Sequence, residues 1–237
     1  MRFLIVITGY NAGAYVAQCL ESVRRQTYDD YQISIVDDGS TDDTWQKIRD
    51  LAPEWAAISR NTQNKGTYFA RDKAINKVPD KSYDVIVLLD MDDELKDNAL
   101  ELVNEEYEKG VYMTYGNWEN HHGEICQVDI TYSDVVHLQK TYRQDTFRCT
   151  HLRTFRKELY FAIPKWELNI GEVRSYPDVE LLFSMMEMCS KERIGVINKV
   201  IYMYRDSQPL STLRRFGKDH LNYKLICDRP ARREIQL

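Results

Sequence analysis

Apolar runs alternate with amphipathic segments along the first part of the chain. Residues 3–7 are continuously apolar, which predicts a strand buried on both faces of a parallel sheet. Further strands are predicted at residues 33–36, 56–59 and 85–89, of which the last is the strongest. Apolar positions at helical spacing predict helices between these strands, over residues 11–26, from Asp42 or Asp43 through Leu51, and over residues 68–76. Strands that alternate with helices in this order predict an α/β fold with a doubly wound, mostly parallel sheet.

The rest of the chain has a less regular pattern. Helices are predicted at residues 95–108, 157–161 and 179–189, and strands at residues 111–115, 196–197 and 200–204. Residues 117–150 are polar and irregular. Because no linker, repeat or low-complexity tract interrupts the sequence, one continuous domain is expected, with a regular half at residues 1–110 and an irregular half at residues 111–237.

Polar clusters follow three of the predicted strands directly. They cover residues 8–11, 37–41 and 90–93. In a parallel doubly wound sheet, ligands bind beyond the carboxyl ends of the strands, where those ends meet at one edge. The pattern therefore gathers clusters that are far apart in sequence at one expected binding site.

The composition is that of a soluble globular protein. The chain has 237 residues, of which 43% are hydrophobic and 29% charged, and its net charge of −5 disfavours a nucleic-acid partner. Five cysteines are scattered without a C-x-x-C spacing, so neither a disulfide framework nor a zinc knuckle is indicated, and reduced thiols in the cytoplasm are expected. No apolar run approaches the ~20 residues of a membrane span. Any lipid partner would have to be reached from the membrane surface.

Three carboxylates crowd the end of the strongest predicted strand, at Asp90, Asp92 and Asp93. Like charges this close repel each other unless something neutralises them. A hard divalent cation prefers oxygen ligands, and Mg²⁺ or Mn²⁺ shared with a diphosphate would neutralise the cluster. The structural alternative is that Asp92 or Asp93 caps the helix expected to start near Glu94, but capping requires one acid and not three.

Further candidates lie near the same edge. Asp37 and Asp38 follow the second strand, where a carboxylate can accept hydrogen bonds from a base edge or a ribose hydroxyl. The alternative is a turn followed by a helix cap, which Asp and Ser serve well. Arg71, on the predicted helix after the Asn64-Lys65-Gly66 turn, either faces a nucleotide or is solvated on its helix face.

An acid in the second half is the candidate general base. Asp178 precedes an apolar helix, and a hydroxyl becomes a good nucleophile only as its proton is removed. Glu180 is the nearby competitor for that role. The structural alternative is a capping box, because Ser175 and Asp178 have the S-x-x-D spacing and Pro177 suits a first turn.

Taken together, the motifs resemble those of family-two glycosyltransferases. The match is ordered and runs through Tyr10-Asn11, Cys19 to Val23, Gln26-Thr27-Tyr28, Val36 to Thr44, Asn64-Lys65-Gly66, Ala70-Arg71 and Leu89 to Asp93. The resemblance implies a GT-A fold, a nucleoside-diphosphate sugar donor, Mg²⁺ or Mn²⁺, and inversion at the anomeric carbon. Residues 1–110 would then bind the nucleotide sugar, and residues 111–237 would bind the acceptor.

The resemblance also implies roles on the nucleotide side. Tyr10 and Asp37 look like contacts to the base and the uridine, and Asp38 belongs to the same motif. Arg71 resembles a nucleotide-side arginine. Asp90 occupies the first Asp-x-Asp position, which holds the ribose. These five residues are the expected nucleotide contacts.

The same resemblance implies which residues hold the metal and which supplies the base. Asp92 occupies the second Asp-x-Asp position and would hold the metal, with Asp93 as an additional acid. Asp178 with Glu180 resembles the later acidic motif of the family, which supplies the base. Asp178 is therefore the expected catalytic residue, with Glu180 as its competitor.

Two departures from the family pattern concern the base and the metal. Pro177 stands where an acid commonly precedes the base. The segment after the Tyr204-Arg205 ending reads Asp206-Ser207-Gln208, whereas many members have a His there that can bind the metal. A non-catalytic nucleotide- or carbohydrate-binding module of the same fold is therefore an alternative. A sugar-1-phosphate nucleotidyltransferase is a weaker one, because no Gly-rich basic loop follows the first strand.

The sequence thus predicts an inverting, metal-assisted glycosyltransferase with an Asp general base. It would move a sugar from a nucleoside-diphosphate sugar, expected to be a UDP-sugar, to a hydroxyl of a glycan or lipid-linked acceptor. A cytoplasmic location is expected. The tail after Ser211 is basic at intervals and predicts a peripheral contact with anionic lipid, with a solvated tail as the alternative.

Overall fold

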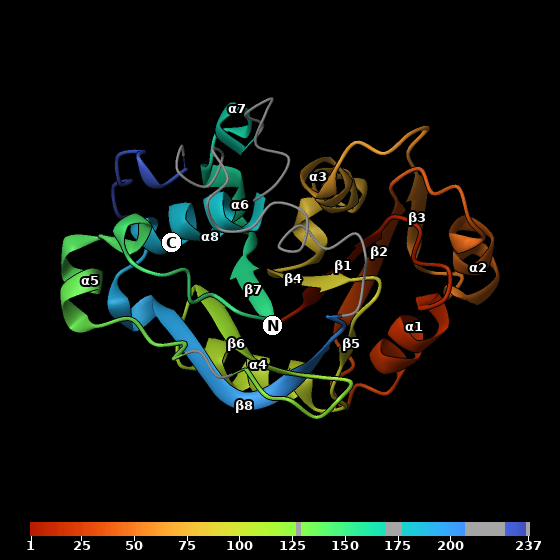
Figure 1. The fold of residues 1–237 in the computed structure, drawn as a ribbon, viewed down its shortest axis with the longest axis horizontal. Helices are drawn as coiled ribbons and strands as arrows, with labels where there is room; N and C mark the ends of the chain where they lie inside the picture. Colours follow the sequence, from red (N-terminus) through yellow and green to blue (C-terminus); the bar gives the residue numbers. More distant parts are fainter. Residues whose placement is uncertain (127–128, 169–176, 207–225, 236–237) are drawn as a thin grey trace.

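The computed structural model describes residues 1–126, 129–168, 177–206 and 226–235 of the chain. Within these residues, one eight-stranded sheet has the strand order β3-β2-β1-β4-β7-β6-β8-β5 (Figure 1). The sheet is curled, and helices cover both of its faces. This is the mixed, mostly parallel α/β fold that the sequence predicts.

The first half of the sheet is parallel throughout. It consists of β1 (Phe3–Gly9), β2 (Tyr31–Asp37), β3 (Ala57–Arg60) and β4 (Val85–Asp90). The connections contain α1 (Val16–Arg24), α2 (Thr44–Leu51), α3 (Thr67–Lys77) and the 3₁₀ turn η1 (Asp80–Ser82). The predicted strands and helices of this half are present, because its central strands are apolar runs that the sheet buries on both faces.

The second half of the sheet adds antiparallel pairs. Its strands are β5 (Glu94–Leu95), β6 (Met113–Asn120), β7 (Arg153–Arg156) and β8 (Ile194–Tyr204). β7 lies between β4 and β6 and is antiparallel to both, whereas β6 and β8 are parallel to each other. The sequence pattern does not predict β7, because this strand contains two arginines and no apolar run.

The helices of the second half differ widely in length. They are α4 (Ala99–Glu108), α5 (Asp134–Gln139), α6 (Lys157–Ala162), α7 (Lys165–Leu168) and α8 (Pro177–Met188), with the 3₁₀ turns η2 (Tyr142–Gln144) and η3 (Lys191–Arg193). The predicted helix start at residue 95 is wrong, because β5 pairs with β8 before the chain turns into α4. Asn98 is at the N-terminal cap of α4, so neither Asp92 nor Asp93 caps this helix.

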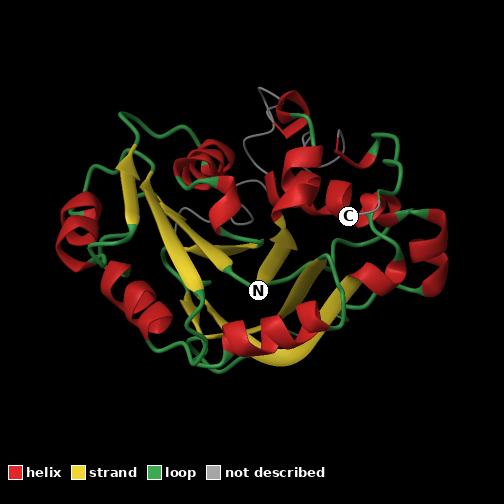
Figure 2. Ribbon diagram, turned by 180° about the vertical axis from the view of Figure 1, so that it is seen from behind, coloured by secondary structure: helices red, strands yellow, loops and turns green. Residues whose placement is uncertain are grey.

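Helices lie on both faces of the sheet (Figure 2), and an apolar core lies on each face. Alternate residues of β1 divide between them. Leu4 and Val6 belong to the core under α3, α6 and α8, whereas Phe3, Ile5 and Ile7 belong to the core under α1, α2 and α4. The carboxyl edge of the parallel strands is therefore held between two packed layers.

A buried ion network connects the C-terminal segment to α8. Arg143, in η2, pairs with Glu180 at 2.9 Å and with Glu187 at 2.6 Å, and it also donates to the carbonyl oxygen of Ile226. Arg143, Glu180 and Glu187 are at most 3% exposed. Arg229 adds a pair with Glu180 at 3.0 Å. The described part of the basic tail is therefore folded onto the protein.

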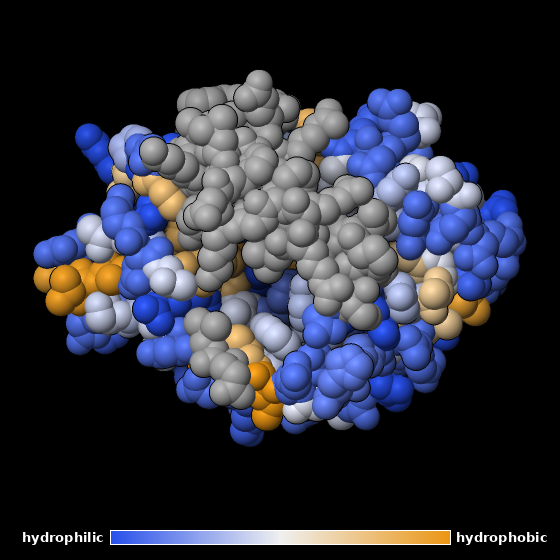
Figure 3. All heavy atoms as spheres, in the orientation of Figure 1, coloured by the Kyte–Doolittle hydropathy of each residue, from blue (hydrophilic) through white to orange (hydrophobic). Residues whose placement is uncertain are grey.

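On the face that Figure 3 shows, the described residues are largely hydrophilic, and apolar side chains gather over α5. Val135 and Leu138 of this helix are 59% and 85% exposed. None of the helices in the described part of the chain combines the length and the apolar composition that a membrane crossing requires.

Candidate active site

The strand register brings the three predicted clusters to one edge of the sheet. Thr8 of β1 pairs with Asp90 of β4, and Gly9 pairs with Asp37 of β2. Tyr10 follows β1 directly and is half-buried, so it lies next to the ends of both neighbouring strands. The structure therefore gathers the clusters as expected, whereas their roles toward a ligand stay predictions.

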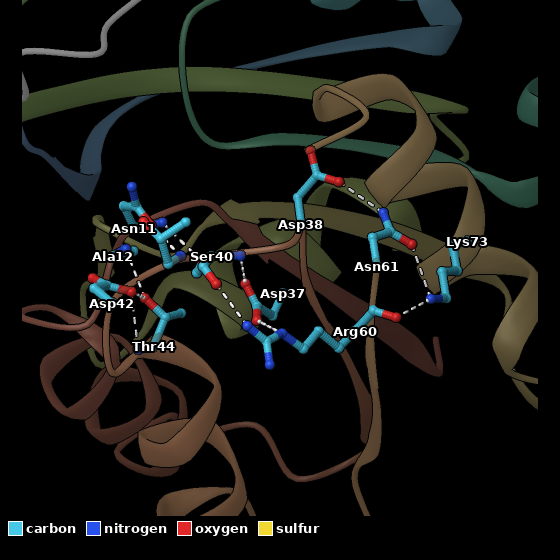
Figure 4. Close-up of polar contacts among 11 residues, drawn as sticks. Asn11, Ala12, Asp37, Asp38, Ser40, Asp42, Thr44, Arg60, Asn61 and Lys73 are labelled. Carbon is cyan, nitrogen blue, oxygen red and sulfur yellow. Dashed lines mark hydrogen bonds and ion pairs between the residues drawn. The ribbon is translucent and has the colours of Figure 1, made fainter. Parts of the chain in front are cut away.

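Asp37 is buried at the end of β2, and both of its carboxylate oxygens are engaged (Figure 4). Its Oδ1 accepts a hydrogen bond from the backbone N–H of Ser40 at 2.9 Å, and its Oδ2 lies 2.9 Å from Nε of Arg60. The Arg60 side chain is 43% exposed, and its Nη2 also donates to the carbonyl oxygen of Ser40 at 2.6 Å. Asp37 thus holds the turn that follows β2.

Asp38 connects the end of β2 to the loop before α3. Its carboxylate accepts hydrogen bonds from Nδ2 of Asn61 at 2.7 Å and from the backbone N–H groups of Lys65 at 3.0 Å and Gly66 at 2.8 Å. Gly66 has a φ of 95°, a conformation that favours glycine, and α3 begins at the next residue. Asp38 therefore positions the loop that leads into the helix of Arg71.

A second set of hydrogen bonds joins the turn after β1 to the turn after β2 (Figure 4). The backbone N–H of Asn11 donates to Oγ of Ser40 at 2.9 Å. Asp42 accepts a hydrogen bond from the N–H of Thr44, the first residue of α2, at 3.0 Å. The side chain of Asp43 makes no capping bond, so Asp42 is the acid that holds the start of this helix.

Asp93 is a buried anchor between the ends of β4 and β8. Its Oδ2 accepts a hydrogen bond from the hydroxyl of Tyr202 at 2.6 Å, and its Oδ1 accepts one from the backbone N–H of Arg205 at 2.7 Å. The residue is 1% exposed. Burial and the charges of Asp92 and Asp90 raise its pKa well above the usual range. Because both oxygens are bonded within the protein, Asp93 has less free capacity for a cation than its neighbours.

Asp92 is the acid of the cluster whose carboxylate has no partner from another residue within the described part of the chain. Among the described residues, no other group donates a hydrogen bond to that carboxylate, whereas the carbonyl oxygen of Asp92 accepts one from Nε of Arg205 at 3.1 Å. Burial and the charge of Asp90 raise the pKa of Asp92 to about 6. A carboxylate with a raised pKa and no partner gains most from a bound cation, so this arrangement fits the predicted metal.

A histidine that the sequence does not single out lies beside the same acids. Ligand atoms of Asp90, Asp93 and His151 lie within 4.8 Å of one another, which makes them the one such group of three in the part of the chain that the structure describes. The His151 ring stacks on Tyr202 with ring centroids 4.6 Å apart. Burial lowers the pKa of His151 well below its usual value, so the imidazole is neutral, the form that binds metals.

Two arginines connect the strand-end acids to the candidate base. Arg71 of α3 pairs with Oδ1 of Asp90 at 2.8 Å and also with Oδ1 of Asp178. From the other side, Nη1 of Arg153 lies 2.6 Å from Oδ2 of Asp178. The side chain of Arg71 is 7% exposed, so the alternative that it is solvated on its helix face is wrong. Burial alone would raise the pKa of Asp178, but the two guanidiniums outweigh it and hold that pKa well below its usual range.

The surroundings of Glu180 favour Asp178 as the base. Glu180 is 2% exposed, and its oxygens pair with Arg143 at 2.9 Å and Arg229 at 3.0 Å. The Asp178 side chain is 26% exposed and meets the strand-end acids through Arg71. α8 begins at Pro177, while Ser175 and Tyr176 of the predicted capping box lie outside the described residues.

The sequence is similar to those of known glycosyltransferases. The family described as "Glycosyl transferase family 2" matches residues 4–162. Glycosyltransferase GlyG of Streptococcus pneumoniae serotype 4 is 24% identical over 227 residues, which cover 85% of this chain and 69% of that protein. A chondroitin synthase of Escherichia coli is 38% identical over 113 residues, which cover 46% of this chain and 16% of that protein.

Solved structures share the fold at lower identity. S. aureus TarS 1–349 in complex with UDP gives a TM-score of 0.68 at 19% identity, over 87% of this chain and 61% of that one. Glucosyl-3-phosphoglycerate synthase from Mycobacterium tuberculosis, in complex with Mn²⁺, UDP and glucosyl-3-phosphoglycerate, gives 0.67 at 14% identity, over 97% of this chain and 81% of that one. These likenesses confirm the expected GT-A fold. The chain spans less than two thirds of the TarS structure and a small part of the chondroitin synthase.

Proposed function

The chain belongs to glycosyltransferase family 2, and from that premise we propose that it transfers a sugar, with inversion, from a UDP-sugar to a hydroxyl of a glycan or lipid-linked acceptor. The observation that carries this proposal is the Arg71 bridge. One guanidinium joins Asp90, on the expected ribose side, to Asp178, on the expected acceptor side. A protein that only bound a nucleotide would not need the acid of α8 at this edge.

On the donor side, the half-buried Tyr10 and the carboxylates of Asp37 and Asp90 contact the nucleoside, and Arg71 contacts the diphosphate. These residues follow or end adjacent parallel strands, and two enzymes with the same fold are described in complex with UDP. Asp38 acts through the loop that it holds, because its oxygens already accept hydrogen bonds from Asn61, Lys65 and Gly66.

A divalent cation, Mn²⁺ or Mg²⁺, is held chiefly by Asp92. Support comes from the carboxylate of Asp92, which has a raised pKa and to which no other described residue donates a hydrogen bond, and from the neutral imidazole of His151 beside Asp90. Asp93 supports the cluster from behind through its bond to Tyr202. When bound, the cation supplies positive charge that offsets the negative charge on the diphosphate leaving group.

In the transfer step, the acceptor oxygen forms a bond to the anomeric carbon while the bond from that carbon to the diphosphate oxygen breaks. The hydroxyl proton passes to a carboxylate oxygen of Asp178, and the nucleoside diphosphate leaves with the bonding electrons. Because the acceptor and the leaving group lie on opposite sides of the anomeric carbon, its configuration inverts.

A donor screen tests this function. Thermal unfolding with Mn²⁺ and a panel of UDP- and GDP-sugars should identify one donor that raises the midpoint, since binding at a hundredfold excess over Kd stabilises the fold by about 2.7 kcal/mol. Release of UDP from that donor then separates an enzyme from a binding module, which would be stabilised without releasing UDP. If no UDP-sugar is bound or turned over in the presence of Mn²⁺, the proposal is wrong.

The proposal includes a peripheral membrane contact through the basic C-terminal segment. Arg214, Arg215 and Lys218 lie outside the described residues, and Arg229 pairs with Glu180 inside the fold. Co-sedimentation with anionic vesicles at low and high salt tests the contact. Binding that salt abolishes is expected, and absence of binding at low salt would reject the contact.

A further inference from the structure

Both oxygens of Asp178 are occupied by guanidinium groups, although a general base needs an oxygen that the acceptor hydroxyl can reach. Arg71 pairs with Oδ1, and Arg153 pairs with Oδ2. The hydroxyl can therefore approach the carboxylate only if one arginine moves away. How each arginine is held within the fold indicates which one moves.

Arg153 is fixed in place by its own surroundings. It lies on β7, which is paired on both sides, and it is in register with Leu88 of β4. Its Nε donates to the carbonyl oxygen of Cys149 at 2.9 Å, and its guanidinium lies over the ring of Phe147 at 5.7 Å. The side chain is 9% exposed. A guanidinium with these contacts keeps its position when the neighbouring charges change.

Arg71 is shared between two acids, and within the described part of the chain its guanidinium has neither a carbonyl acceptor nor an aromatic ring beside it. Its Nη2 pairs with Asp90 at 2.8 Å, and its Nη1 pairs with Asp178. A diphosphate that binds beside Asp90 carries more negative charge than one carboxylate, and a guanidinium can bind its oxygens in a bidentate way. The diphosphate therefore competes with Asp178 for the Arg71 guanidinium.

We propose that Arg153 is a positioning residue for the base: it holds Oδ2 of Asp178 while Arg71 moves to the donor diphosphate and frees Oδ1 for the acceptor hydroxyl. The inference rests on the proposed function and deepens it, because donor binding becomes the event that unblocks the base. Arg153 touches neither the donor nor the acceptor in this scheme, and its effect passes entirely through Asp178.

Arg153→Gln tests the scheme in the full chain with Mn²⁺ and the UDP-sugar that the donor screen identifies. The variant should lower kcat about tenfold to a hundredfold, the effect of losing one charge-assisted hydrogen bond, while donor KM and UDP affinity stay within about twofold of wild type. Arg153→Lys keeps the positive charge and should recover part of kcat. UDP release measures kcat and KM, and calorimetric titration with UDP and Mn²⁺ measures affinity without turnover.

Two further substitutions serve as comparisons. Arg156→Gln makes the same exchange on the same strand, but the Arg156 guanidinium lies over the rings of Tyr107 and Tyr112 and not at Asp178. It should leave kcat and KM unchanged. Arg71→Gln should instead weaken UDP affinity, because this arginine is the one that moves to the diphosphate.

Several outcomes would overturn the inference. If the wild type is active and Arg153→Gln has the same kcat, Asp178 needs no positioning residue. Equal losses of kcat and UDP affinity would make Arg153 a donor contact. If thermal unfolding shows that Arg153→Gln does not fold, Arg153→Lys decides the case, since a change in kcat with unchanged KM supports the inference and no change in kcat rejects it. A wild type that releases no UDP rejects the proposed function and this inference with it.

Discussion

The edge of the site, which the turns after β1, β2 and β4 form, is held together differently from the wall of the site, which β7, α8 and η2 form. At the edge, carboxylates accept hydrogen bonds from nearby backbone N–H groups, as Asp38 does. In the wall, charged side chains pair with charged side chains from distant segments, as Arg143 does with Glu187 and Arg153 with Asp178. The edge therefore forms with the parallel sheet, whereas the wall forms only when the second half packs onto it.

The two kinds of contact should respond differently to substitution. One hydrogen bond to a turn contributes about 1 kcal/mol to the free energy of unfolding. Removal of one partner from a buried ion pair costs about 3–5 kcal/mol, because the other charge stays buried without compensation. Stability should therefore depend more on the wall than on the edge, although the edge provides most of the expected donor contacts.

The largest effect is expected from Asp178→Asn, which keeps the shape of the wall and removes the base. We expect kcat to fall about 10²- to 10⁴-fold, the range that proton transfer by a positioned group contributes. UDP affinity should not fall and should rise slightly, because the diphosphate no longer competes with a charged Asp178 for Arg71. UDP release and calorimetric titration measure the two quantities. If Asp178→Asn keeps the wild-type kcat, the wall has a structural role and no catalytic one.

The next largest effect is expected from Arg143→Met in the wall. Glu180 and Glu187 would stay buried with less compensation, so the free energy of unfolding should fall by about 3–5 kcal/mol. Urea denaturation measures the change. Arg25→Met is the control, because the pair of Arg25 with Asp97 is about half exposed and should contribute less than about 1 kcal/mol. Equal losses in the two variants would show that the wall is no more sensitive than the surface.

The edge could be predicted from the sequence, because the apolar run that predicts each strand also marks, where it stops, the end of the strand at which a ligand is expected. The apolar runs of β2 and β4 stop at Asp37 and Asp90, and parallel strands place their ends together. The wall could not be predicted in this way. β7 has no apolar run, and Asp178 finds its partners 107 and 25 residues away, at Arg71 and Arg153. No local pattern encodes such pairs, so the sequence could single out Asp178 by its place before an apolar helix and by the resemblance to a family, but it could not predict the partners of Asp178.

The boundary of α4 illustrates the same limit within the regular half. Leu95 continues the apolar pattern of the helix, but it pairs with Tyr202 of β8, far along the chain. A short strand therefore replaces the first turn of the expected helix. Because of this tertiary pairing, the helix begins several residues later than expected. Neither Asp92 nor Asp93 is therefore used as its cap.

A smaller effect should appear in the pH dependence of the edge. The pKa of Asp92 is about 6 in the fold, whereas an unfolded Asp ionises near 3.9. Because the folded state binds this proton more tightly, the free energy of unfolding of the metal-free protein should fall as the pH rises from about 4 to about 6. Below about pH 6, Mn²⁺ must displace a proton, so its affinity should fall by up to about tenfold per pH unit.

Asp92→Asn separates these two consequences. The variant should raise the free energy of unfolding of the metal-free protein at pH 7.5 by about 1 kcal/mol, less than full linkage predicts because the side chain is partly exposed. It should also abolish the stabilisation that Mn²⁺ gives the wild type. Thermal unfolding with and without Mn²⁺ at pH 5.0 and 7.5 measures both effects. If Mn²⁺ stabilises the variant as much as the wild type, the metal is bound instead by the group formed by Asp90, Asp93 and His151.

The smallest effects are expected at the turn before α2, where Asp42 accepts hydrogen bonds from backbone N–H groups. Asp42→Ala should lower the free energy of unfolding by about 1 kcal/mol, because the N–H groups of Gly13 and Thr44 lose their acceptor. Asp43→Ala should change it by less than about 0.5 kcal/mol, since its carboxylate pairs with the exposed Lys47. Urea denaturation of both variants gives the difference, and kcat should not change in either. If Asp43→Ala lowers the free energy of unfolding more than Asp42→Ala does, charge at the cap position stabilises this part of the edge more than the hydrogen bonds of Asp42. The edge and the wall would then differ only in how deeply their charges are buried.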